Sequence, residues 1–235
     1  MRYRLSKTSP RLTSTKLLIE TKDGLVARLV SINGRPLSAA DNQKELNRLD
    51  GLLADPSRQK HRKQSEDDDT ARAMKVLRAL PKAFLYELAP TDAASPASPS
   101  PLLKFDFKPN PDFSPPDLET QVLTEMSGNI WIEPALARVT RLEGHLQQDV
   151  DFGWGILGRL NKGGWIVIEQ ADVGQGSWRI VHFQMRMSGR VLFKSKVFDT
   201  VEDESDFTPV TAGLGYRKAI QMLRQSDAAE DRADH

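Results

Sequence analysis

Residues 128–199 consist of short runs of alternating apolar and polar side chains, separated by tight glycine-containing turns. This region holds all four tryptophans and ten of the 15 glycines. Turns such as Gly174-Gln175-Gly176-Ser177 are too short for the crossover that parallel strands require, so the strands must be antiparallel. The sequence predicts strands over the ranges 128–133, 138–146, 164–173, 178–187 and 191–199.

The first half mixes a hairpin with helices. Strands are predicted at 13–21 and 24–32, joined by Lys22-Asp23-Gly24, because Asp-Gly favours a tight hairpin turn. Ser38 and Asp41 form an N-cap pair before leucines at helical spacing, which predicts a helix over 39–54. A second helix is expected over 66–80, after a polar junction at 55–65, with Pro81 ending it.

The remaining segments have weaker signals. Alternation predicts strands at 84–88 and 103–107, on either side of a Pro/Ala/Ser-rich loop at 90–101. Residues 151–162 are expected to form a helical turn or a packed loop, and the acids between 199 and 206 a solvent-facing loop. The end of the chain is predicted as a helix over 212–225 and a disordered tail over 226–235.

Helices that fall within one run of strands indicate an α+β fold with the helices on one face of an antiparallel sheet. We expect one domain over residues 1–225. The chain has 33 basic and 32 acidic residues and no cysteine. It therefore has no disulfide, thiolate metal site or cysteine nucleophile. No apolar window approaches the roughly 18 residues that span a bilayer, and residues 1–10 lack the apolar segment of a signal peptide.

The motifs for catalysis, metals and nucleotides are weak. Residues 153–158 match G-x-G-x-x-G, but the full helix and parallel strand that a dinucleotide site needs are not expected after them. Glu143, His145 and His182 can be drawn as a metal site, yet solvated polar faces are far commoner. The basic run 58–63 lacks the interleaved aromatics of a nucleic-acid site. We predict no catalytic residue, no cofactor, no metal and no nucleic-acid partner.

One apolar face of the predicted meander is the candidate binding surface. Period-2 alternation places its members on one side of the sheet: Ile130, Ile132, Val181, Phe183, Met185, Met187, Val191 and Phe193. Two interpretations stay open. The face is either a core covered by the helices, or a core plus an apolar cavity that suits acyl chains, since methionine adapts to irregular ligands.

Three segments carry a resemblance to a known family: MSGNIWIEPALARVTRLEGHL, DVDFGWGILGRLNKGGWIVIEQ and GSWRIVHFQMRMSGRVLF. In that family a strand reading G-x-I-W-I-[DE], here 128–133, precedes one reading R-L-E, here 141–143. The chain resembles the LolA/LolB-like proteins that sort outer-membrane lipoproteins, related in fold to the sensor domain of RseB/MucB regulators. The likeness covers about residues 83–207.

The resemblance implies a curved antiparallel sheet, an incomplete β-barrel wrapped around a few helices with a hydrophobic cavity between them. It also implies a non-enzymatic function: binding or carriage of lipid or lipoprotein acyl chains in the bacterial envelope, in the periplasm, with peripheral membrane contact. The alternative is an envelope protein-interaction or regulatory domain with a fully packed core. Envelope proteins are then the expected partners.

Overall fold

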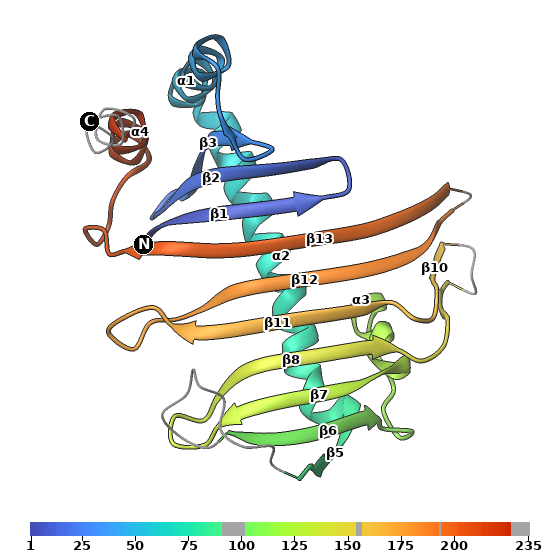
Figure 1. The fold of residues 1–235 in the computed structure, drawn as a ribbon. Helices are drawn as coiled ribbons and strands as arrows, with labels where there is room; N and C mark the ends of the chain where they lie inside the picture. Colours follow the sequence, from blue (N-terminus) through green and yellow to red (C-terminus); the bar gives the residue numbers. More distant parts are fainter. Residues whose placement is uncertain (91–101, 154–156, 193, 227–235) are drawn as a thin grey trace. The chain divides into compact units, whose positions relative to one another are not determined.

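The computed structural model describes residues 1–90, 102–153, 157–192 and 194–226 (Figure 1). The chain divides into two compact units. Unit 1 comprises Met1–Ala71 and Glu202–His235, and unit 2 comprises Arg72–Val201. Helix α2 (Pro56–Ala83) and strand β13 (Lys194–Thr208) each contribute residues to both units. Among the described residues, no helix is both long and apolar enough to cross a membrane.

Unit 1 is an antiparallel sheet with helices. Its strands follow the order β4-β3-β2-β1-β13, with the second part of β13 at one end. The bounds of these strands are β1 (Arg2–Ser9), β2 (Leu12–Thr21), β3 (Gly24–Ile32) and β4 (Arg35–Pro36). The helices of unit 1 are α1 (Ala39–Ala54), the first part of α2, and α4 (Tyr216–Gln225).

The hairpin and the first helix are confirmed. β2 pairs with β3, and Gly24 at the turn has a φ of 111°, a conformation that glycine adopts without strain. The Ser38 hydroxyl accepts a hydrogen bond of 3.1 Å from the Asp41 backbone N–H, as the N-cap pair predicts. Strand β1 was not predicted, because its RYRLSKTS sequence is mostly polar and only half-buried.

The core of unit 1 forms between β2, β3, α1 and α4 around side chains such as Ile19, Leu49 and Ile220. Arg28 is buried among them, and its guanidinium donates to the Leu223 carbonyl at 2.5 Å. A cation at this carbonyl, in the last turn of α4, stabilises the helix terminus.

Both predicted helices are present, but the polar junction expected at 55–65 is wrong, because α2 is continuous from Pro56 to Ala83. Pro81 lies inside this helix and does not end it. Asp55 caps its start by accepting from the Arg58 N–H at 2.9 Å. The polar segment is then stabilised by neighbouring turns, as in the Lys63–Asp67 ion pair at 2.9 Å. An exposed helix needs no apolar stripe, so hydrophobic periodicity does not detect it.

Unit 2 is a second antiparallel arrangement, in the order β13-β12-β11-β8-β7-β6-β5, starting from the first part of β13. Its strands are β5 (Phe84–Leu88), β6 (Leu103–Pro109), β7 (Met126–Glu133), β8 (Arg138–Leu146), β9 (Val150–Phe152), β10 (Gly158–Leu160), β11 (Trp165–Asp172) and β12 (Trp178–Val191). The short helices α3 (Leu118–Gln121) and η1 (Val122–Glu125) precede β7.

Two predicted loops are strands instead. Within 151–162, residues 151–152 belong to β9 and residues 158–160 form β10; the two strands pair with each other, and β10 also pairs with β12. The acidic run 199–206 lies within β13. Its acids tolerate the strand because basic partners face some of them: in unit 1, Lys7 binds Glu202 at 2.6 Å and Arg4 binds Asp206 at 3.0 Å.

The α+β class with an antiparallel sheet is confirmed. The described strands number 13, and their path has two ends, β4 and β5, so the sheet is not closed into a barrel. The predicted loop 90–101 and tail 226–235 fall almost wholly outside the described residues. The single domain over 1–225 stays a prediction beside the two units.

Glycine allows two central strands of unit 2 to approach closely. Gly128 on β7 pairs with Gly144 on β8. A Cβ at Gly128 would lie 1.9 Å from the Glu143 carbonyl oxygen, and one at Gly144 would lie 2.8 Å from the Met126 sulfur. The carbonyl belongs to the backbone of β8 and cannot move without disturbing the sheet, so only glycine fits at position 128.

We therefore expect Gly128→Ala to lower the free energy of unfolding by about 2 kcal/mol or more, since overpacking a well-ordered interior is destabilising. Urea unfolding followed by circular dichroism measures this. Gly51→Ala is the matched control: Gly51 lies in α1 with no atom near its added Cβ. It should stabilise the protein by about 0.5–1 kcal/mol. Equal stability of the two variants would contradict the close approach of the strands.

Candidate functional site

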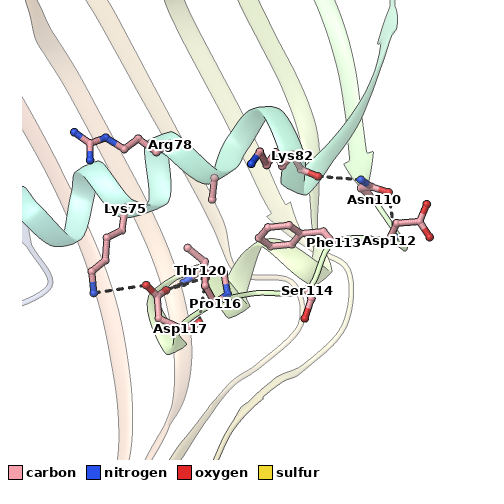
Figure 2. Close-up of a pocket in the computed structure, with 11 residues that line it drawn as sticks. Lys75, Arg78, Lys82, Asn110, Asp112, Phe113, Ser114, Pro116, Asp117 and Thr120 are labelled. Atoms are coloured by element: carbon pink, nitrogen blue, oxygen red, sulfur yellow. Dashed lines mark hydrogen bonds and ion pairs between the residues drawn. The ribbon is translucent and has the colours of Figure 1, made fainter.

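An open groove of about 530 Å³ lies in unit 2 between the second part of α2 and the segment 110–120 (Figure 2). This volume is in the usual range for small-molecule sites. One wall is helical and the other is an irregular segment that leads into α3. Both walls belong to unit 2, and Ala79 and Phe113 pack against the core of that unit.

The helical wall is a row of side chains from three successive turns of α2. Lys75, Arg78, Ala79 and Lys82 recur at i, i+3, i+4 and i+7, the spacing of one helix face. The neighbouring face carries Val76, Leu80 and Ala83, which pack on the core of the sheet. Ala79 touches both the groove and this core. A small residue at this place leaves room that a longer side chain would fill.

Asn110 links the segment 110–120, the second wall of the groove, to the C-terminal end of α2 through hydrogen bonds. Its side-chain amide donates to the Lys82 carbonyl at 2.9 Å and its backbone N–H donates to the Ala83 carbonyl at 2.8 Å. These bonds satisfy carbonyls that a helix end leaves without partners. The Asn110 side chain also accepts from the Asp112 N–H at 3.1 Å. The turn so formed places Phe113 across from the helix, as Figure 2 shows.

Asp117 closes the far end of the groove. Its carboxylate caps α3 by accepting from the Thr120 hydroxyl at 2.8 Å and from the Thr120 N–H at 3.0 Å. Lys75 lies 3.5 Å from the same carboxylate and 3.8 Å from that of Glu119. The hydrogen bonds from Thr120, and then the charge of Lys75, hold the pKa of Asp117 below its usual value.

Two cations of the rim stay without an acidic partner. Arg78 and Lys82 form no ion pair among the residues that the structure describes, whereas Lys75 is neutralised by Asp117 and Glu119. Ala79, Phe113 and Pro116 contribute apolar surface to the same groove. Phe113 and Ala79 also pack against the core cluster of unit 2. The groove therefore suits an apolar chain with a negatively charged end.

The predicted apolar face lies partly in this same core. Ile130 and Met187 are buried in it, and Ile132 and Met185 pack against it. Phe183 is half-buried, and it is opposite Ile168 in the sheet register. Val181 is half-buried as well, at an irregularity in the pairing of β11 with β12.

The last two predicted residues are at the end of β12. Val191 is 47% exposed and lines a small apolar pocket of about 130 Å³ with Phe152, Leu157, Leu160 and Phe198. Phe193 lies outside the described residues. The structure thus brings Ile130, Ile132, Met185 and Met187 into one cluster, and it places Val191 at a different site.

Of the polar residues considered for metal binding, Glu143 is engaged in an ion pair. Arg141 donates to the Glu143 carboxylate at 2.7 Å and also pairs with Glu169. His145 is opposite Trp165 in the register of β8 and β11. Within the described ranges, no group of three His, Cys, Asp or Glu side chains has the spacing of a metal site. In the glycine motif, Gly158 opens the three-residue strand β10 rather than a helix.

Sequence reasoning missed the residues of the groove. The spacing of Lys75, Arg78 and Lys82 on one face of a helix was readable, since basic residues alternate there with apolar ones. The other wall carried no signal, because Asn110 and Phe113 lie in a proline-rich segment without periodicity. The contact between walls some 35 residues apart is a tertiary property.

Comparison of the chain with protein-family models, with curated proteins and with solved structures gives no match.

The lowered pKa of Asp117 predicts a pH-dependent contribution to stability. Because the folded pKa lies below the unfolded value of about 3.9, the ionised carboxylate stabilises the protein above that pH, and this is lost as the pH falls through the folded pKa. Asp117→Asn should therefore lower the melting temperature at pH 7, and the deficit should shrink at pH 3. Asp112→Asn, in the same segment, is the control. A deficit that does not change with pH would show that the carboxylate charge is not responsible.

Proposed function

We propose that this protein binds, without catalysis, the acyl chains of lipids or lipoproteins that carry a negative charge near the chain. The observation that supports this is the groove beside α2, where apolar residues that pack against the core lie with Arg78 and Lys82. Neither cation forms an ion pair within the described part of the chain. The acyl chain lies along Ala79 and Phe113. The charged end faces the two cations.

The energetics suit reversible carriage. Each CH₂ group removed from water contributes about 0.8 kcal/mol, so a few methylenes give useful affinity. The two cations are exposed, and exposed charge pairs add about 0–1 kcal/mol each. Binding is then strong enough to hold an acyl chain in water and weak enough to release it. A wholly enclosed cavity would exchange its ligand more slowly.

The sequence supports the same class of ligand independently. The resemblance of residues 83–207 to lipoprotein-sorting proteins of the LolA/LolB type implies acyl-chain carriage in the periplasm, which we include in the proposal. Phe113 and Ala79 pack against the cluster that holds Ile132 and Met185, two members of the predicted apolar face. We therefore place the acyl chain at the groove and on the sheet surface next to it.

A second candidate function is protein interaction at the edge of unit 2. Strand β5 ends the sheet order, and its Leu85, Tyr86 and Leu88 are exposed. An apolar edge strand is a template for pairing with a strand of another chain. This supports the regulatory alternative, in which the core is fully packed and carries no ligand.

Native mass spectrometry of protein purified without detergent separates the two candidates. We expect additional mass that corresponds to bound lipid and that disappears after delipidation. Protein that stays ligand-free when it is mixed with excess anionic lipid, while a partner chain binds and protects β5 from hydrogen exchange, would favour the regulatory function.

A fluorescent fatty acid tests the groove directly. Ala79→Trp fills the groove and should weaken binding of the probe at least tenfold, whereas Ala73→Trp, on an exposed position of the same helix, should not. Arg78→Gln with Lys82→Gln should weaken it about three- to tenfold. Lys108→Gln with Lys162→Gln is the control for lost charge. Unchanged binding by folded Ala79→Trp would refute the groove as the site.

Phe183→Glu tests whether the sheet face takes part. Phe183 is half-buried, so the variant can be checked for folding by circular dichroism before binding is measured. We expect it to lose most of its affinity for the fatty acid. Full affinity in a folded variant would confine the site to the groove and would make the assignment of the face wrong.

A further inference from the structure

The turn between β12 and β13, together with Leu157, exposes a cluster of large apolar side chains. We call this cluster the β12–β13 tip, and its members are Leu157, Val191, Leu192 and Phe198. The Leu192 N–H donates to the Leu157 carbonyl at 3.1 Å, which joins the two parts of the cluster. In Figure 1, β10 lies beside the end of β12, with which it pairs. Leu192 is 53% exposed and Leu157 is 50% exposed.

The charged side chains within the segment 190–198 are all basic. Residues 190–198 include the exposed cations Arg190, Lys194 and Lys196 and no acidic residue. The nearest acids are already paired. Asp149 and Asp151 both bind Arg159, at 3.3 and 2.6 Å.

Asp199, the next acid along β13, lies 3.8 Å from Arg186. Arg190 lies close enough to Asp151 for its charge to lower the pKa of that carboxyl, after the larger effect of Arg159. Lys194 and Lys196 form no ion pair among the residues that the structure describes, so they are the uncompensated charges beside the apolar surface. Lysine and arginine side chains next to apolar groups can keep their charged ends in water while their stems lie on the apolar surface.

Folding does not account for the residue at the turn. Leu192 has a φ of 53°, the left-handed region that glycine and asparagine adopt far more readily than leucine. A leucine here is strained and has half of its surface in water. Glycine or asparagine would form the same turn with less strain and without an exposed side chain. The leucine is therefore better explained by what it contacts outside the chain.

We propose that the β12–β13 tip docks on an anionic lipid bilayer. Leu192, Val191 and Leu157 enter the boundary between headgroups and acyl chains, and Lys194 and Lys196 bind the lipid phosphates. The pairing of exposed apolar side chains with unopposed cations distinguishes this surface from a protein interface, whose centre is depleted of charged residues, lysine in particular. The inference does not depend on the ligand of the groove, because the residues of the tip do not line it.

Co-sedimentation of the full chain with lipid vesicles tests the proposal. We expect binding to vesicles of phosphatidylcholine and phosphatidylglycerol in equal parts, and at least tenfold weaker binding to phosphatidylcholine alone. Raising the salt concentration should weaken the first and leave the second unchanged. Equal binding to both vesicles would overturn the role of the cations, and no binding to either would overturn the proposal.

Variants locate the contact. Lys194→Gln with Lys196→Gln should weaken binding about thirtyfold, whereas Lys108→Gln with Lys162→Gln should not. Leu192→Asn should weaken it about tenfold or more. Asparagine suits the backbone at this position, so the loss cannot come from misfolding. Leu136→Asn, at an exposed position of the β7–β8 turn, is the apolar control.

The two proposals fail separately. Tip variants should keep their affinity for the fluorescent fatty acid, and Ala79→Trp should keep its affinity for vesicles. Vesicle binding that survives in both tip variants would show that the bilayer contacts another surface. If the protein does not bind vesicles but forms a complex with a partner chain through Leu192, the tip is a protein interface and the proposal is wrong.

Discussion

The packing of the second part of α2 on the core of unit 2 determines which side chains of the helix line the groove. Val76, Leu80 and Ala83 bury one face of the helix in the core, and this fixes which face remains for Lys75 and Lys82. The hydrophobic effect has no preferred direction. Because helix periodicity fixes the angle between side chains, however, burying one face of the helix also sets which side chains lie on the other face. The cationic wall of the groove is therefore a by-product of the apolar face.

Local signals in the sequence predicted the elements that are held by local interactions. The hairpin of β2 and β3 has an Asp-Gly turn, and α1 has a side-chain cap, so each could be derived from a few neighbouring residues. The continuous helix α2 could not, because its polar half is stabilised by ion pairs and hydrogen bonds rather than by an apolar stripe. Strand β1 was missed for a related reason: pairing with β2 overrides its mixed composition.

The candidate site was predicted only in part because a pattern of alternation identifies a face but not its cover. Met187 and Ile130 do share a face, and the structure shows that they are buried in the core. The open space lies beside them, where Phe113 from an aperiodic segment meets Ala79 of the helix. Asn110 brings these two walls together through bonds to carbonyls at the helix end, which no spacing rule in the sequence encodes.

The left-handed leucine at the β12–β13 turn also bears on engineering. Natural proteins gain stability readily where a strained residue is replaced by one that fits its backbone, and such gains commonly reduce function. A laboratory selection for thermal stability is expected to replace Leu192 with asparagine or glycine, because both fit its backbone conformation better. The more stable variant would lack the exposed leucine, so its surface properties would differ from those of the natural protein.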